Sequence, residues 1–199
     1  MDSPSPVRRI SCAGLWVSAN TLALLVGRSR KTIFRWTADG TITRREAKQG
    51  AQYHLQDVLK HVPLEITDRL CRVIREVDKE RPSALCQLGL RFLQANFPKL
   101  AIPCLQQAAK GQDKDAMAWL SQCYQNGQGV PKDLFLAAKW LGEAACHGHP
   151  AAQRVVAQFY GIERTEWNED SSVQDQKESL QEAIQKQSVM LREILQKLG

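Results

Sequence analysis

The chain has 199 residues, of which 43% are hydrophobic and 24% are charged, and its formal net charge is +6. These proportions match an ordinary globular protein, and no apolar run approaches the roughly 20 residues that a membrane-spanning helix needs. The composition therefore argues against a membrane protein, and we expect a cytoplasmic location and no membrane partner.

The positive charge is concentrated in one part of the chain. Residues 1–62 contain ten Lys and Arg and four Asp and Glu, whereas the remaining 137 residues contain seventeen of each sign. A positive excess confined to one small region is typical of a domain that binds nucleic acid. Double-stranded DNA is therefore the first partner that the sequence predicts.

No stretch of the sequence forms a recognisable catalytic or cofactor-binding motif. A nucleophile elbow, a phosphate-binding glycine loop and a dinucleotide-binding fingerprint are all missing. The six cysteines form no Cys-x-x-Cys pair, and we expect reduced thiols. The segment 146–149 holds metal-ligand residue types without a second cluster, so packing is favoured over the alternative of a zinc site. We predict a non-enzymatic protein with no catalytic residues, no metal and no cofactor.

Two short helices joined by a tight turn are predicted near the N-terminus. Ser18 and Ser29 have the residue type and the position of N-caps for helices at 19–26 and 30–38. Gly27 between them suits the positive φ that such a turn often needs. The spacing therefore predicts a helix-turn-helix.

A basic two-stranded wing is predicted after the second helix. Segments 41–43 and 51–53 are β-prone, and the loop 44–50 between them is rich in Lys and Arg. Residues 55–61 then have the pattern of a further helix, which Pro63 ends.

This region resembles the winged helix-turn-helix of the MerR and excisionase-like families. The resemblance covers about a quarter of the chain and rests on the small-Leu-Leu-x-Gly-x-Ser run of 23–29, Thr32-Ile33-Phe34-Arg35-Trp36, Asp39-Gly40, and Tyr53 four residues before Asp57. It implies that the second helix enters the major groove and that the wing contacts the flanking backbone. The position before the wing tyrosine is often Arg in these families and is Gln52 here, so neighbouring cations of the wing are expected to substitute.

The second helix and the wing supply the candidate DNA-binding residues. The apolar side chains of Ile33, Phe34 and Trp36 are expected to reach the core and its rim, which leaves the cations outside. Arg and Lys neutralise phosphates, and Arg, Ser and Thr at the start of a recognition helix reach base edges. The predicted DNA-binding residues are Ser29, Arg30, Lys31, Thr32, Arg35, Arg44, Arg45, Lys48 and Tyr53. The alternatives are a merely solvated helix face and a helix-turn-helix reused for protein contact.

An internal repeat follows a linking helix. Apolar residues at helical spacing predict this helix over 64–80, and we expect it to pack on the first repeat. Between 83 and 162 similar residues recur at offsets of 32 and 36: Ala84, Leu88 and Phe92 match Ala116, Leu120 and Tyr124, which match Ala152, Val156 and Tyr160. Such recurrence predicts the stacked helix pairs of a short α-solenoid.

The second copy resembles a Sel1-like repeat, a relative of the tetratricopeptide repeat. The resemblance rests on Ala118-x-Leu120-x-x-x-Tyr124-x-x-Gly127-x-Gly129-Val130, Ala137-x-x-Trp140-Leu141 and Ala144-Ala145-x-x-Gly148. It implies that the repeats hold a partner protein on their concave face. The alternative is that so short a stack acts only as a spacer.

The C-terminal segment has the apolar spacing of a coiled coil. After a polar linker at 163–175, apolar side chains in 176–199 recur at alternating spacings of three and four residues, interrupted by Lys177 and Gln187. The predicted oligomerisation residues are Leu180, Ile184, Leu191, Ile194 and Leu198. We predict a homo-oligomer formed through this helix; the alternative is one amphipathic helix folded back on the repeats.

The predicted fold class is mainly α. Its parts are a disordered lead-in (1–14), a winged helix-turn-helix DNA-binding domain (15–62), a linking helix (63–82), Sel1-like helical repeats (83–162), a linker (163–175) and a coiled-coil helix (176–199). Together they predict a bacterial, sequence-specific DNA-binding regulator whose repeats bind a partner protein. The alternatives are a protein-interaction adaptor whose helix-turn-helix does not bind DNA, and an architectural DNA-binding protein in recombination or plasmid maintenance.

Overall fold

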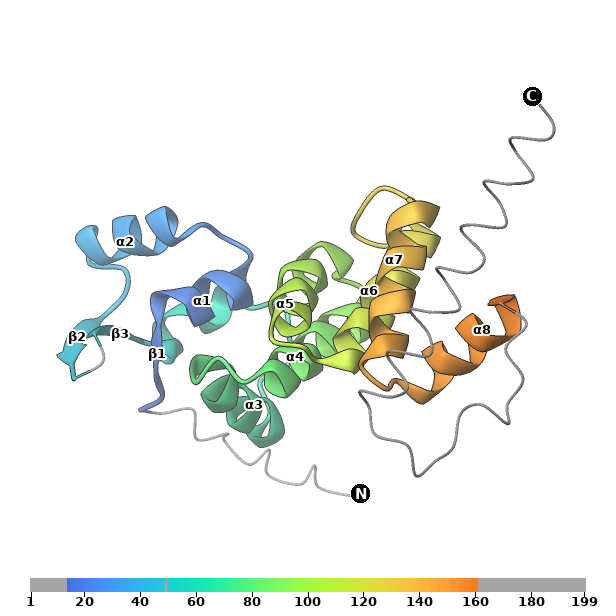
Figure 1. Ribbon diagram of the computed structural model, residues 1–199. Helices are drawn as coiled ribbons and strands as arrows, with labels where there is room; N and C mark the ends of the chain where they lie inside the picture. Colours follow the sequence, from blue (N-terminus) through green and yellow to red (C-terminus); the bar gives the residue numbers. More distant parts are fainter. Residues whose placement is uncertain (1–13, 49, 161–199) are drawn as a thin grey trace, which may run out of the picture. The chain divides into compact units, whose positions relative to one another are not determined.

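The computed structural model describes residues 14–48 and 50–160 (Figure 1). The described part is mainly helical with a small three-stranded sheet, so the prediction of a mainly α protein is confirmed. The chain divides into two compact units, with the boundary between Gln107 and Ala108. The predicted lead-in, apart from Gly14, the predicted linker and the predicted coiled-coil helix lie outside the described residues.

The first unit begins with the sheet and two short helices (Figure 1). Its elements are β1 (Trp16–Ser18), α1 (Ala19–Val26), α2 (Arg30–Ala38), β2 (Arg44–Ala47), β3 (Gly50–His54), the 3-10 helix η1 (Leu55–His61), α3 (Asp68–Asp78), α4 (Pro82–Gln94) and most of α5 (Pro98–Lys110). The sheet order is β1-β3-β2, and β3 is antiparallel to both neighbours.

Both predicted N-caps are confirmed. The Oγ of Ser18 accepts a hydrogen bond from the amide of Thr21, and the Oγ of Ser29 accepts one from the amide of Thr32, each at 3.3 Å. Gly27 ends α1 with a φ of 64°, the left-handed conformation that the turn requires. These local signals fix both helices at the predicted residues.

The predicted wing is wrong in its boundaries and in its number of strands. The amides of Thr41 and Ile42 donate to the carbonyl of Trp36 at 2.8 and 3.2 Å, which closes the end of α2 and delays the strand to Arg44. The basic residues predicted for the tip of the wing therefore lie mostly within β2. The strand β1, which has three residues and pairs with β3, was not predicted from the sequence.

The apolar core of residues 16–61 comes from every element except β2, whose residues are exposed or half-buried. Its fully buried side chains include Val17, Leu22, Leu25, Ile33, Tyr53, Leu55 and Val58. On α2, Ile33 is buried and Trp36 is half-buried, as expected, but Phe34 is 46% exposed. A step of one residue turns a helix by about 100°, so the residue after Ile33 points away from the core.

Helix α3 joins this region to the helices that follow. It begins at Asp68, later than predicted, because the side chain of Thr67 caps it by accepting from the amide of Leu70 at 3.2 Å. Its packing against α4 is confirmed, and it also contacts α1 and β1. The Oδ1 of Asp78 accepts from the amide of Ser18 and from the hydroxyl of Thr21, both at 2.7 Å. The end of α3 is thereby tied to the start of α1.

The second unit contains the helices that follow the boundary, α6 (Lys114–Asn126), α7 (Leu134–Cys146) and α8 (Pro150–Tyr160). The start of α6 lies 32 residues after that of α4, and the start of α7 lies 36 after that of α5, so the predicted offsets are confirmed as helix pairs. Helix α7 packs against both α6 and α8, through buried small residues that include Ala116, Ala144 and Ala152. The carboxylates of Asp113 and Asp133 cap α6 and α7.

The prediction of reduced thiols is wrong at Cys71, which is disulfide-bonded. Sequence spacing does not show which cysteines approach one another once the chain folds. Cys104 and Cys123 are free thiols, and both are buried. Burial raises the pKa of Cys104 to about 12 and also raises the pKa of Cys123, so both remain protonated at neutral pH.

Candidate nucleic-acid interface

The outer face of α2 is cationic. Its exposed residues are Arg30, Lys31, Phe34, Arg35 and Ala38, and the helix contains no acidic residue. Positions three and four apart are neighbours on a helix surface, so these side chains form one continuous face. Three positive charges on one helix without a carboxylate among them suit an anionic partner.

The N-terminal end of α2 is shaped by two hydroxyl groups. The Oγ of Ser29 lies 3.2 Å from the Oγ1 of Thr32, in addition to capping the helix. Ser29 is exposed and Thr32 is half-buried. The cap orients the first turn of α2, from which Arg30 and Lys31 project.

The arginines of β2 are held by neighbouring side chains. The guanidinium of Arg45 donates to the Oε1 of Gln52 from Nε at 3.2 Å and from Nη2 at 2.8 Å, and it lies 4.4 Å from the ring centroid of Trp16. Arg44 forms an ion pair with Glu46. Gln52 stands where the resembling families often have Arg. Here its side chain orients Arg45 on the neighbouring strand.

Tyr53 is a predicted DNA-binding residue that lies buried in the structure. Its side chain is only 2% exposed. It lies opposite Val17 in the register of β1 and β3, and Val17 is fully buried. Alternate residues of a strand point to opposite faces, and Tyr53 lies on the face that packs on the core. The tyrosine therefore stabilises the sheet and offers no surface to a ligand.

Asp57 stabilises the base of the wing. Its Oδ2 accepts from the amide of Thr43 at 2.7 Å, and its Oδ1 lies 3.4 Å from the Nδ1 of His54. Burial raises the pKa of Asp57, but the hydrogen bonds from Thr43 and the interaction with His54 outweigh it, so the pKa lies below its ordinary value. The ring of His54 also packs on Trp16, with 4.9 Å between the ring centroids.

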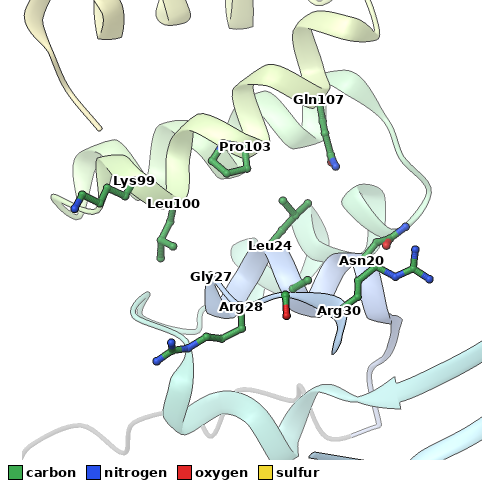
Figure 2. Close-up of a pocket in the computed structure, with 11 residues that line it drawn as sticks. Asn20, Leu24, Gly27, Arg28, Arg30, Lys99, Leu100, Pro103 and Gln107 are labelled. Carbon is green, nitrogen blue, oxygen red and sulfur yellow. The ribbon is translucent and has the colours of Figure 1, made fainter. Parts of the chain in front are cut away.

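A cleft of about 400 Å³ adjoins the turn between α1 and α2 (Figure 2). Leu24 of α1 and Leu100 of α5 point into it, and Lys99, Pro103 and Gln107 complete the α5 side. Its lining includes three cations and no carboxylate: Arg28, Arg30 and Lys99.

Two of these cations, Arg28 and Lys99, were not predicted from the sequence as site residues. Arg28 directly precedes the cap of α2, and its place beside Ser29 was a usable signal. Lys99 lies in the electrically neutral part of the sequence, and only the fold brings it to the same cleft as Arg28. A cleft with several cations and no acid suits a phosphate or another anion.

One histidine of the 146–149 segment, His149, has a structural use in the second unit. The Nδ1 of His149 accepts from the amide of Ala152 at 3.1 Å and so caps α8. Its Nε2 lies 3.7 Å from the Oδ1 of Asp115. Among the described residues, no group of three or more His, Cys, Asp and Glu side chains is placed to hold a metal ion.

Comparison with protein families gives a match in the second unit. Residues 114–149, which comprise α6, α7 and the loop between them, match the Sel1 repeat. The predicted resemblance of the second copy is thereby confirmed, and the match indicates a role in protein–protein interaction. Comparisons with curated proteins and with solved structures gave no match.

Helix α7 exposes large apolar side chains at its start. Phe135 is 80% exposed and Leu134 is 61% exposed. Both lie in the first turn of the helix, just before the buried Ala137.

Within the part of the chain that the structure describes, no helix is long and apolar enough to cross a membrane.

Proposed function

We propose that this protein is a DNA-binding regulator, in which the first unit binds duplex DNA and the Sel1 repeat holds a protein partner. The observation that carries the proposal is the outer face of α2, where Arg30, Lys31 and Arg35 project together from a capped helix without a carboxylate. On this proposal the segment 15–62 is a winged helix-turn-helix, and α2 is its recognition helix.

The chemistry of duplex DNA suits this face. The major groove admits one α-helix, and an arginine in it binds the O6 and N7 atoms of guanine through two hydrogen bonds. Lysines and the remaining arginines neutralise phosphates and release counterions. We assign Arg30 and Arg35 to base edges and Lys31 to phosphate, with Ser29 and Thr32 beside them at the start of the helix.

The wing is assigned to the DNA backbone. Arg45 is oriented by Gln52 and Trp16 before any ligand arrives, so little side-chain entropy is lost when it contacts a phosphate. Arg44 and Lys48 are exposed on the same strand and turn. Arg28 and Lys99 at the cleft extend the cationic surface, and Tyr53 is left out because it is buried.

The protein partner is assigned to the Sel1 repeat. The exposed Phe135 and Leu134 supply apolar surface of the kind that protein interfaces bury. Self-association through the segment 176–199 belongs to the same proposal, because a dimer would present paired DNA-binding units to paired half-sites.

The test is binding of the full chain to a pool of randomised duplex DNA at low salt, followed by selection of a preferred site. We expect Arg35→Ala to lower affinity for the preferred site by roughly five- to a hundredfold, with little change on random DNA. Arg44→Ala should weaken binding to all sequences alike and reduce the salt slope by about one. Arg75→Ala on α3, which also removes an exposed arginine, is the matched control and should change neither.

Two results would overturn parts of this proposal. If no DNA is retained at low salt, the regulator is rejected, and the protein-interaction adaptor, which the Sel1 repeat favours, takes its place. Equal losses on every sequence for Arg35→Ala and Arg44→Ala would reject α2 as the recognition helix.

A further inference from the structure

Phe34 is an exposed aromatic residue within a cationic helix face. Its side chain is 46% exposed, whereas the adjacent Ile33 is fully buried. Its helix neighbours at four residues on either side, Arg30 and Ala38, are both exposed, as is Lys31 three residues before it. The phenyl ring therefore belongs to the same outer face as the arginines and not to the core.

The ring is also paired with one of those arginines. The guanidinium carbon of Arg30 lies 5.7 Å from the ring centroid of Phe34, within the range of a cation–π contact. Side chains four residues apart have Cβ atoms about 5–6 Å apart on a helix. The helix thus presents an apolar group and a donor group side by side, at a fixed spacing.

We propose that Phe34 reads the C5-methyl group of a thymine. This inference rests on the proposed function and deepens it by naming what the site recognises. The thymine methyl is the apolar group that the major groove presents among hydrogen-bonding base edges, and phenylalanine is one of the side chains that contact it. An exposed ring on a helix in that groove has no better partner there.

The pairing with Arg30 predicts the arrangement of bases. An arginine binds guanine most often, and successive bases along one strand are about 3.4 Å apart. A spacing of about 5–6 Å between the two side chains therefore corresponds to one or two base steps. The preferred site should contain a thymine within two base pairs of the guanine that Arg30 contacts.

The experiment replaces thymine with uracil in the selected site, one position at a time. Uracil pairs as thymine does but lacks the methyl group, whose burial corresponds to about a fourfold change in affinity. The full-length wild type should lose about fourfold at one thymine near the predicted guanine. Phe34→Ala should bind the thymine and uracil versions equally, and Phe34→Leu should keep part of the preference.

The matched control is Phe97→Ala, because Phe97 is a phenylalanine of similar exposure (40%) that lies in the first unit but outside α2. It should keep the wild-type preference for thymine. If the wild type shows no preference at any thymine, or if Phe34→Ala keeps the preference, the inference is rejected while DNA binding stands. If no DNA is bound at all, the proposed function fails and this inference fails with it.

Discussion

The N-terminal region and the Sel1 repeat differ in the length of their helices and in their charge, although side chains cap the helices of both regions. Helices α1 and α2 have eight and nine residues. Helices α6 and α7 have thirteen residues each and pack through buried alanines. Residues 15–62 carry eight Lys and Arg against three acids, whereas residues 114–149 carry three of each.

The two regions therefore gain their stability differently and present different surfaces. Helices as short as α1 and α2 are marginal in isolation, so they depend on caps and on tertiary packing, and their outer faces are free to carry charge. The longer repeat helices gain stability from close packing along their length. Their balanced charge leaves exposed apolar groups such as Phe135 as the distinctive surface feature.

The comparison is tested most severely by removing charge from each region in turn. Replacing Arg30, Lys31 and Arg35 with Gln should lower affinity for the preferred site at least a hundredfold, because two base contacts are lost. It should reduce the salt slope by about one, because Lys31 is the residue of the three assigned to a phosphate and each phosphate contact contributes about 0.9. Fluorescence anisotropy across a salt series measures both quantities.

The control removes three exposed charges from the neutral part of the chain: Lys110, Lys132 and Lys139. Replacing them with Gln should change DNA affinity by less than about twofold, because their loss leaves the α2 face intact. Comparable losses in the two triple variants would mean that net charge alone drives binding, and the contrast between the regions would disappear.

A pair of glycine substitutions should change stability in opposite directions. Gly27→Ala places a side chain at a φ of 64° and its Cβ 2.2 Å from the Cδ2 of Leu100, so we expect a loss of about 1–2 kcal/mol. Gly142 lies inside α7 and an added Cβ would meet open space, so Gly142→Ala should raise stability by about 0.5–1 kcal/mol. Urea unfolding of both full-length variants measures the difference, and two changes of the same sign would contradict this account.

The smallest effect concerns the pH dependence of the wing. The pKa of Asp57 is lowered in the folded protein, so its stabilising effect is complete above the ordinary aspartate pKa of about 3.9 and is lost as the pH falls through the lowered value. Asp57→Ala should cost about 1 kcal/mol at pH 7 and less at pH 3. Unfolding at both pH values tests this, and a cost that is independent of pH would reject the charged hydrogen bond to Thr43.

The repeats and the capped helices were predictable because their signals are local or recur along the sequence. Ser18 and Ser29 are recognisable as caps from residue type and position, and the offsets of 32 and 36 reproduce the spacing of the helix pairs. The strand β1 has no such signal, since its three residues form a strand only by pairing with β3. The start of β2 also lacks a local signal, because it depends on the hydrogen bonds that the amides of Thr41 and Ile42 donate to the carbonyl of Trp36.

The sequence predicted the charges of the candidate interface but not which aromatic side chains are exposed or buried there. The cations of α2 follow from composition and helical spacing. The exposure of Phe34 was missed because an aromatic residue next to Ile33 resembles a core position, and the burial of Tyr53 depends on strand register. Lys99 reaches the cleft only through the packing of α5, which no local pattern reveals.

The carboxylate of Asp78 makes the stability of the N-terminal region depend on α3. It accepts hydrogen bonds from the amide of Ser18 and from the hydroxyl of Thr21, a side chain that is only 2% exposed. A fragment cut at residue 62 would lose this charged acceptor and both of its hydrogen bonds, and a hydrogen bond to a charged group is worth about 1.5–3 kcal/mol. Residues 15–62 alone should therefore be less stable than a fragment that also includes α3, and a fusion to another protein should include α3.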